Sequence, residues 1–441
     1  MPKNFYVCEP ICPEEQYYVP RDDVINSIVQ KLLSPNNSVL LQNHRQAGKS
    51  SLLLPITKLL KEKGQVVLCI SLRGIGSHDF WISLSQRINA VHGVGGSEFH
   101  DAAGFLNFFG WNNFKKDVCL ILDDIHHLLS SPNVCESFLS ALRVTKTARD
   151  TNLEKTYALA GILGIGLLLV KKLILSDSKA SPFIESDLFR LPQPSEGAVR
   201  QMFTSFGNDV DLDLAIFGRD IYGRTGGHMG LTSLLGKYLQ EWIMGNLQRK
   251  SKSRITIGEW VAHMCGSGFA GYLSESNCNM TIMPSLRSHT PISLSARIFL
   301  RDLLHGTGSV ADPSLGSESL RDVVDYLEIV DIVVRIESDS STGVRTTEVR
   351  LAAPLLCVIL LSYFNEFDPV RVPRWLQLQT KDGFSNQLEL LSCIRQSLPF
   401  MDRNRIYQDS SLNSNGRPVD FSYHFDSILC CSLWHLHLVG A

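Results

Sequence analysis

Hydrophobic and polar positions follow a repeating order up to Leu191. Short apolar runs, typical of buried strands, alternate with longer segments whose apolar residues recur at helical spacing. The predicted strands are Val39–Leu41, Val66–Leu72, Val118–Leu122, Tyr157–Leu163 and Phe189–Leu191. The predicted helices are Asp22–Leu33, Lys49–Lys63, Phe80–Val91, Ala102–Phe109 and Val134–Val144. This alternation favours an α/β fold with a parallel sheet.

The pattern changes after Pro194. Ser195 is a typical helix N-cap, and a mainly helical region follows it to about Gly245. From residue 293 to 364 the order is helix, Gly/Ser-rich loop, helix, hairpin and helix, which is the order of a winged helix. The hairpin strands are expected at Asp331–Ile336 and Val344–Leu351.

The composition is that of a globular protein. Hydrophobic residues make up 44% of the 441 residues, which excludes wholesale disorder. The 42 Lys and Arg against 44 Asp and Glu give a net charge of −2, so no global basic excess indicates nucleic acid or an anionic membrane. The longest apolar run, Ala158–Val170, is too short to span a bilayer. The N-terminal residues lack the apolar core of a secretory signal.

The cysteines favour a reducing, intracellular compartment, because eleven of them, an odd number, are scattered along the chain. Cys69, Cys119 and Cys357 lie in apolar runs and are expected to be small buried thiols. The pairs Cys8–Cys12 and His435–His437 lack the spacing of a zinc site, so we predict none there.

The clearest chemical signal follows the first predicted strand. It reads Asn43-His44-Arg45-Gln46-Ala47-Gly48-Lys49-Ser50 and matches G-x-x-x-x-G-K-[ST] at every fixed position except the first. In such a loop, backbone N–H groups surround phosphate oxygens, Lys49 reaches the β- and γ-phosphates, and the Ser50 hydroxyl ligates Mg²⁺. Asn43 replaces the expected glycine; because Asn tolerates a positive φ, the turn is expected to survive. We predict a nucleotide site from Asn43 to Ser51.

A second signal is the pair of acids that ends the strand Val118–Leu122. Ligands of open parallel sheets lie at the carboxyl ends of the strands. Asp123 is therefore predicted to hold Mg²⁺, directly or through water. Asp124 is predicted to orient or deprotonate the attacking water. Asp is shorter than the Glu usual at this second position, so turnover is expected to be slow. Together with Lys49, these acids complete a nucleotide-hydrolysing site.

Two further segments leave alternatives open. The strand Tyr157–Ile162 has no Asn, Thr or Ser at its end to sense a γ-phosphate, which favours a plain buried strand. Arg219, Arg224 and His228 lie around a Gly-rich stretch. His228 opens an apolar helix, so it either approaches the nucleotide from a helical lid or caps that helix after a turn.

These motifs together resemble a known family. QNHRQAGKSSLL, LILDDIH, ALAGILGIG, SPFIESDLFRLPQPSEGAVRQMF and DIYGRTGGHMGL are similar to the AAA-like, STAND-related P-loop ATPase module, and more narrowly to the NTPase of Crinkler-type effectors of oomycetes and early-diverging fungi. The likeness covers roughly residues 15 to 365. It implies a P-loop sheet with a helical lid, and ATP and Mg²⁺ as ligands.

The resemblance also sets expectations for the C-terminal part, because family members often carry a winged helix and a restriction-endonuclease-like domain. A helix with Glu389 and a strand with Asp420 look like the start of such a domain. No Glu and no Lys follows Asp420 to complete its metal site, so we expect a truncated tail without nuclease activity. The family's N-terminal translocation header is not apparent, so delivery to a host cell is suggested by the resemblance alone.

The predicted organisation has six parts. They are a leader (1–22), a P-loop α/β core (23–192), a helical lid (193–250), a linker or helical segment (251–292), a winged-helix-like domain (293–365) and an endonuclease-like tail (366–441).

Three functions stay open at this point. The first is a nucleotide-driven switch or slow ATPase; the absence of an N-K-x-D motif after the second acid favours ATP over GTP. The second is a DNA-associated protein, although its candidate recognition helix Ser317–Leu327 carries Glu318, Asp322 and Asp325 against Arg321 alone. The third is an interaction protein without turnover, which binds a protein partner or its own copy. No membrane partner is expected.

Overall fold

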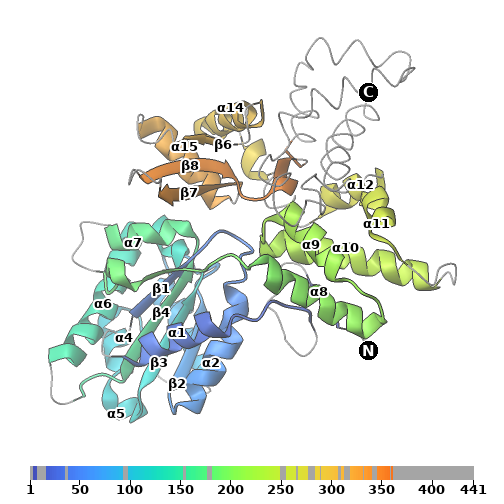
Figure 1. Ribbon diagram of the computed structural model, residues 1–441. Coiled ribbons are helices and arrows are strands. Elements are labelled where there is room, and N and C mark those ends of the chain that lie inside the picture. Colours follow the sequence, from blue (N-terminus) through green and yellow to red (C-terminus); the bar gives the residue numbers. More distant parts are fainter. Residues whose placement is uncertain are drawn as a thin grey trace, which may run out of the picture. The chain divides into compact units, whose positions relative to one another are not determined.

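The fold is known from a computed structural model, drawn in Figure 1. It describes residues 3–6, 16–34, 38–92, 98–151, 155–175, 181–248, 255–264, 267–276, 284–288, 290–305, 309–311, 318–330, 332–339, 345–357 and 359–360. These residues form two compact units. One takes in Met1–Asp211, Gly227–Ser233 and Glu328–Asp331; the other takes in Leu212–Gly226, Leu234–Leu327 and Ile332–Ala441. Within the described ranges, no helix combines the length and the apolar character needed to cross a membrane.

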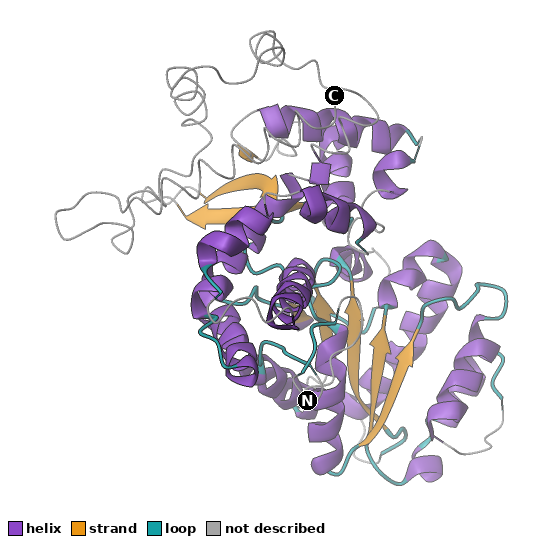
Figure 2. Ribbon diagram, turned by 90° about the vertical axis from the view of Figure 1, so that its right-hand side faces the viewer, coloured by secondary structure: helices purple, strands orange, loops and turns teal. Residues whose placement is uncertain are grey.

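The first unit is built on a parallel sheet of five strands, as predicted (Figures 1 and 2). Its order is β2-β3-β4-β1-β5, and each neighbouring pair runs parallel. The strands are β1 (Ser38–Gln42), β2 (Val66–Ser71), β3 (Val118–Asp123), β4 (Leu159–Gly166) and β5 (Leu188–Arg190). Because all five point the same way, their carboxyl ends meet at one edge.

Helices cover both faces of this sheet, since successive side chains of a strand point to opposite sides. Val39 and Leu41 belong to a core shared with α1 (Asp22–Leu33) and α2 (Leu53–Glu62). Leu40, between them, belongs to the core on the other face. That core also includes side chains from α3 (Phe80–His92), α4 (Ala102–Phe108) and α6 (Pro132–Thr151).

The start of the fourth strand and the start of the helix after the first strand differ from the predicted bounds. The fourth strand begins at Leu159 because Tyr157 forms an isolated antiparallel bridge with Gly110 instead of joining the sheet. The predicted helix from Lys49 begins as the 3₁₀ turn η1 (Ser50–Leu52) before α2. The remaining short elements are α5 (Trp111–Phe114), η2 (Ile125–Ser130), η3 (Leu168–Lys171), α7 (Lys172–Leu175) and η4 (Glu185–Asp187).

Helix α8 (Glu196–Val210) also belongs to the first unit. The predicted N-cap is confirmed: the Ser195 hydroxyl accepts a hydrogen bond from the Ala198 N–H at 3.2 Å. The buried side of α8 packs its aromatic rings against the N-terminal residues, with the rings of Phe5 and Phe203 5.3 Å apart. This contact ties the first described residues to the helix.

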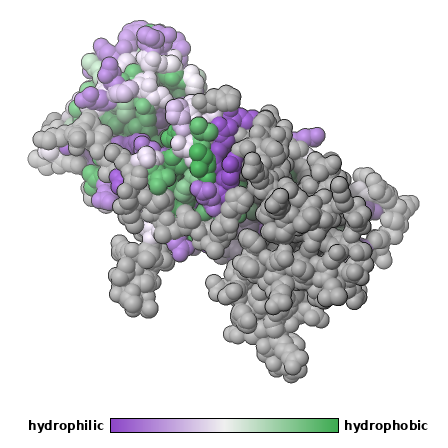
Figure 3. All heavy atoms as spheres, turned by 90° about the horizontal axis from the view of Figure 1, so that it is seen from above, coloured by the Kyte–Doolittle hydropathy of each residue, from purple (hydrophilic) through white to green (hydrophobic). Residues whose placement is uncertain are grey.

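The second unit contains α9 (Ala215–Thr225), most of α10 (Met229–Gln248), α11 (Ile257–Met264), α12 (Ser267–Glu275), α14 (Pro291–His305), α15 (Glu318–Ile329) and the strands β6 (Ser309–Ala311), β7 (Val333–Asp339) and β8 (Arg345–Leu351). The strands form an antiparallel sheet of order β6-β8-β7, so the predicted hairpin is confirmed. Hydrophobic side chains reach the surface among the coloured residues of Figure 3; on α14, Leu294 and Ile298 are more than half exposed. The predicted tail lies outside the described residues.

Candidate functional site

The loop that follows β1 contains two residues in the left-handed region. Gly48 has φ 84° and Gln46 has φ 56°. Asn43 itself does not use the positive φ that an Asn residue tolerates, because it is absent from the positive-φ residues of the described chain. Gln46 adopts the left-handed conformation instead, at a cost that a non-glycine residue bears only where its surroundings hold it.

Asn43 contributes to the loop through its side chain. It is buried, and its Nδ2 donates to the carbonyl oxygen of Leu191 at 2.5 Å. Its Oδ1 accepts from the N–H of His44 at 2.8 Å. A glycine could make neither bond, so the departure from the motif fixes the start of the loop to the segment after β5.

Lys49 is directed into its own loop. The side chain is buried, and Nζ donates to the carbonyl oxygens of Asn43, at 3.1 Å, and of His44. An ammonium group in this position carries its positive charge inside the ring of backbone that the motif predicts to surround a phosphate. Lys49 therefore has carbonyl oxygens of its own loop as partners, and its contact with a phosphate stays a prediction.

The two predicted Mg²⁺ ligands lie next to each other. The hydroxyl of Ser50 donates to Oδ2 of Asp123 at 3.0 Å, and Oδ1 of Asp123 accepts from the N–H of Asp124 at 2.9 Å. Burial raises the pKa of Asp123, and the charge of Asp124 raises it further, while the bond from Ser50 opposes the shift. A hydroxyl and a carboxylate are oxygen donors of the kind that Mg²⁺ prefers, so these residues fit that ion.

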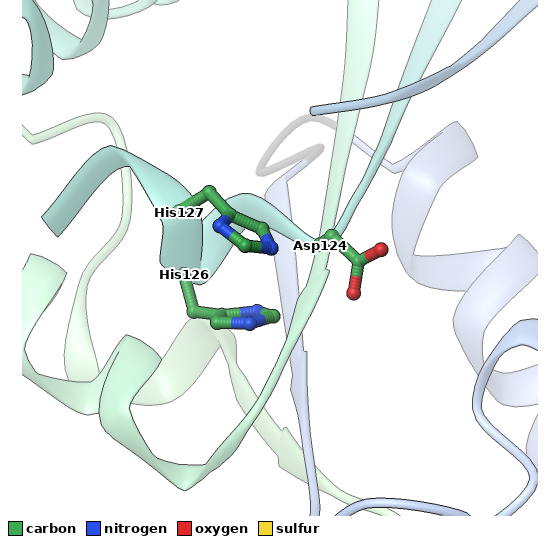
Figure 4. Close-up of side chains that lie close together, drawn as sticks. All are labelled: Asp124, His126 and His127. Carbon is green, nitrogen blue, oxygen red and sulfur yellow. The ribbon is translucent and has the colours of Figure 1, made fainter. Parts of the chain in front are cut away.

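Asp124 occupies a left-handed turn with φ 57° directly after β3. Its Oδ2 lies 3.4 Å from Nε of Arg73, whose side chain is exposed. Figure 4 shows that the rings of His126 and His127, on η2, come together with Asp124 at this point. Burial lowers the pKa of His126 to about 4, and the neighbouring His127 adds to that effect.

His228 caps helix α10, as one of the two interpretations predicted. Its Nδ1 accepts from the N–H of Leu231 at 3.3 Å, and Gly227 before it has φ 81°. The same ring stacks on His44 of the loop, with centroids 4.8 Å apart and planes inclined by 24°. Both histidines are buried. The first turn of α10 thus packs on the loop, and contact of His228 with a nucleotide stays a prediction.

A second contact joins the loop to α10. A Cβ placed on Gly230 would lie 2.3 Å from Oε1 and 2.6 Å from Cβ of Gln46, so only glycine allows this approach. Two further partners of the loop, Gln193 and Leu191, were not predicted from the sequence. Nε2 of Gln193 lies 2.8 Å from Nε2 of His44, and Leu191 receives the bond from Asn43. In the sequence, Gln193 and Leu191 lie in a proline-bearing segment that directly follows the short fifth strand, and this segment is the signal that could have indicated them.

Other predicted residues take different positions. Arg45 is exposed and Ala47 is buried, while Ser51 is half-buried on η1. Arg224 is held within the second unit, where its Nε donates to Asp220 at 2.9 Å. The tail residues Glu389 and Asp420 lie outside the described residues. Three cysteines were expected to be buried thiols. Cys119 is buried as predicted, but Cys69 and Cys357 are only half-buried; all three are free thiols.

Comparisons with known proteins find likeness in structure alone. No protein-family model matches the chain, and no curated protein matches it. Among solved structures, Aeropyrum pernix ORC1 in complex with DNA is 14% identical, with a TM-score of 0.42, over 80% of this chain and 94% of that one. Aeropyrum pernix ORC2 with ADPNP and ADP is 15% identical, with a TM-score of 0.45, over 78% and 92%. Cdc6p of Pyrobaculum aerophilum is 14% identical, with a TM-score of 0.42, over 79% and 96%. At this level of similarity, the functions of those proteins do not transfer to this chain.

The chain's own geometry is consistent with its motifs. A parallel five-stranded sheet of a mixed α/β unit fits a P-loop, AAA-like fold. The strand β4 lies between β1, which leads into the GKS loop, and β3, which ends in the acid pair. The carboxyl ends of β1 and β3 are nevertheless close enough for Ser50 to reach Asp123.

Proposed function

We propose that this chain binds ATP with Mg²⁺ and acts as a nucleotide-dependent switch or slow ATPase. The hydrogen bond between Ser50 and Asp123 carries the proposal. These two residues are far apart in the sequence, and each was selected by a separate motif. Their side chains meet at the sheet edge where parallel sheets bind ligands, which is the arrangement that an ion between loop and strand requires.

Each residue of the site would take a distinct role. Lys49 would exchange the carbonyl oxygens of Asn43 and His44 for phosphate oxygens, which are stronger partners for an ammonium group. Ser50 and Asp123 would hold Mg²⁺, which neutralises phosphate charge. Asp124 would orient the attacking water, because it lies directly beside Asp123, whose Oδ1 accepts a hydrogen bond from the Asp124 N–H.

The contact between the loop and α10 supports a switch. His44 and Gln46 belong to the loop, and they pack against His228 and Gly230 at the start of α10. A nucleotide that reorders residues 43–49 would therefore change the surface on which α10 begins. We propose the predicted lid, residues 193–250, as the element that responds, and a protein partner or a second copy of the chain as the reader of that response. We also propose that the chain is related to Crinkler-type NTPases, that its second unit contains a winged helix, and that the protein acts inside the cell.

Phosphate release from MgATP tests the enzymatic part. The wild-type chain should release phosphate slowly, and Asp124→Asn should lower the turnover number while ATP affinity is retained, because Asp124 acts on water rather than on the nucleotide. Asp209→Asn is a matched control, since that carboxylate lies on α8 and binds the Tyr17 hydroxyl. Equal turnover of wild type and Asp124→Asn would contradict the role of Asp124.

A further inference from the structure

We propose that Asp124, His126 and His127 form a binding site for a transition-metal ion such as Zn²⁺, distinct from the Mg²⁺ site expected at Ser50 and Asp123. One ligand atom from each of the three residues lies within 4.8 Å of the other two. Figure 4 shows the two rings and the carboxylate at the end of β3, where the chain enters η2.

The local backbone produces this juxtaposition. Asp124 lies in the left-handed region at the point where the chain leaves β3 and enters η2. The 3₁₀ segment that follows places His126 and His127 two and three residues further on, and the N–H of His127 donates to the carbonyl oxygen of Asp124 at 3.0 Å. The three side chains are therefore gathered within one turn, which limits the conformational entropy lost when an ion orders them.

The donor set selects the class of metal. Two imidazoles and one carboxylate suit Zn²⁺ and related transition metals, whereas Mg²⁺ demands oxygen donors. Three protein ligands leave the fourth tetrahedral position open to water or to a phosphate oxygen. The neighbouring pair Ser50 and Asp123 offers oxygen ligands alone. The pair therefore suits Mg²⁺, whereas the cluster of Asp124, His126 and His127 suits a transition metal.

The spacing is compatible with an ion after a small adjustment. Ligands about 2.0–2.1 Å from Zn²⁺ in a tetrahedron lie roughly 3.3–3.4 Å apart, which is closer than the 4.8 Å limit of this cluster. His127 is exposed, so its ring can turn toward Asp124 without disturbing the core. The adjustment is a side-chain rotation rather than a movement of β3.

His126 supplies a second observation. Its Nδ1 is buried and has no hydrogen-bond partner among the described residues. A buried polar atom without a partner is unfavourable, and buried imidazole nitrogens are normally paired. Metal ligation through Nδ1 would satisfy this atom.

Three nearby cations oppose the binding of a metal ion. Arg73 approaches Asp124 Oδ2 at 3.4 Å, but its side chain is 77% exposed, and surface pairs of this kind contribute little. Lys49 and Arg45 add positive charge that acts on His126. A metal ion that binds the carboxylate must therefore compete with Arg73 for Asp124.

The site has a consequence that rests on the proposed function. An ion held by Asp124 would take this carboxylate away from the attacking water. Zn²⁺ should then slow phosphate release without reducing ATP binding, and the chain would be an ATPase that a transition metal inhibits.

Zn²⁺ binding to the full-length, nucleotide-free chain tests the site independently of ATP. In competition with a chromogenic chelator, His126→Gln and His127→Gln should each weaken one Zn²⁺ site at least about tenfold relative to wild type. His100→Gln removes an exposed histidine outside the cluster and should bind Zn²⁺ as wild type does. Circular dichroism establishes that each variant is folded; His127 is exposed, so its replacement should not disturb the fold.

Identical Zn²⁺ affinities for wild type, His126→Gln and His127→Gln would overturn the proposal. The proposed ATP binding is tested independently of the Zn²⁺ site, because it depends on Lys49 and is measured with Mg²⁺ as the only metal ion. A chain that binds Zn²⁺ through these residues but no ATP would retain the metal site and lose the proposed function.

Discussion

Asn43 illustrates how one side chain can replace the conformational freedom of a glycine. The phosphate-binding pattern places glycine here, and the chain places a buried amide that bonds to Leu191 and His44. Both partners are main-chain groups, the carbonyl oxygen of Leu191 and the N–H of His44. The cost of losing a buried hydrogen bond includes the desolvation of the partner that remains.

Asn43→Ala should lower the free energy of unfolding by about 1–3 kcal/mol, because it removes two buried hydrogen bonds. Chemical denaturation measures the change. Asn113→Ala is the matched control: its amide also donates to two carbonyl oxygens, but it is exposed, so water can replace the lost bonds and the loss should be smaller. An Asn43→Ala chain as stable as wild type would refute this role.

His126 should make stability depend on pH. Its pKa is about 4 in the folded chain against an ordinary 6.5. Between these values the unfolded chain binds more protons, so the free energy of unfolding should fall as the pH drops from 6.5 toward 4. Denaturation curves at several pH values should show a flatter dependence for His126→Gln than for wild type. His100→Gln controls for loss of an exposed imidazole, and parallel curves for wild type and His126→Gln would count against the shift.

At the scale of elements, the loop depends on how α10 approaches it. Gly230 lies in the first turn of α10, directly against Gln46, which holds a left-handed backbone. Near the end of the same helix, a Cβ placed on Gly245 would meet no atom within 4 Å. The packing of α10 therefore requires a glycine at position 230 but not at position 245.

Gly230→Ala and Gly245→Ala should change stability in opposite directions. The first overpacks the contact with Gln46 and should cost about 1–3 kcal/mol. The second adds helix propensity without a clash and should gain about 0.5–1 kcal/mol. Thermal or chemical denaturation of the two variants provides the comparison; a neutral Gly230→Ala would show that the loop does not depend on this approach.

The strands and their order of alternation with helices could be predicted, because apolar runs such as Val118–Leu122 are buried on both faces of the sheet. The acid pair could be placed because it ends such a run. The backbone of the loop could not be predicted, since Gln46 is held by Gly230, which lies far from it in the sequence. The contacts of His126 and His127 depend on the turn at Asp124, whose left-handed backbone no local pattern indicated.

At the scale of the whole molecule, the charge distribution bears on the alternative of DNA binding. The net charge of the chain is −2. In α15, the candidate recognition helix, most of the charged side chains are acidic. Its Asp325 is paired with Arg335 of β7 at 2.9 Å, so the positive charge on that strand is already engaged. Proteins bind DNA phosphates through Lys and Arg side chains, which displace the counterions condensed on the DNA, and this helix offers few such side chains.

The full chain should therefore show no salt-dependent binding to duplex DNA. Fluorescence anisotropy with a labelled duplex at about 50 and 200 mM salt measures it, and a nucleic-acid-binding protein would lose affinity steeply between roughly these concentrations. Tight binding that weakens steeply with salt would favour the DNA-associated alternative instead.

Equilibrium binding of ATP in the presence of Mg²⁺ tests the central claim most directly. The account predicts that the wild-type chain binds ATP and that Lys49→Ala weakens the binding at least about tenfold, which corresponds to about 1.4 kcal/mol for the lost ammonium–phosphate contact. An Lys49→Ala chain that binds ATP as tightly as wild type would contradict it.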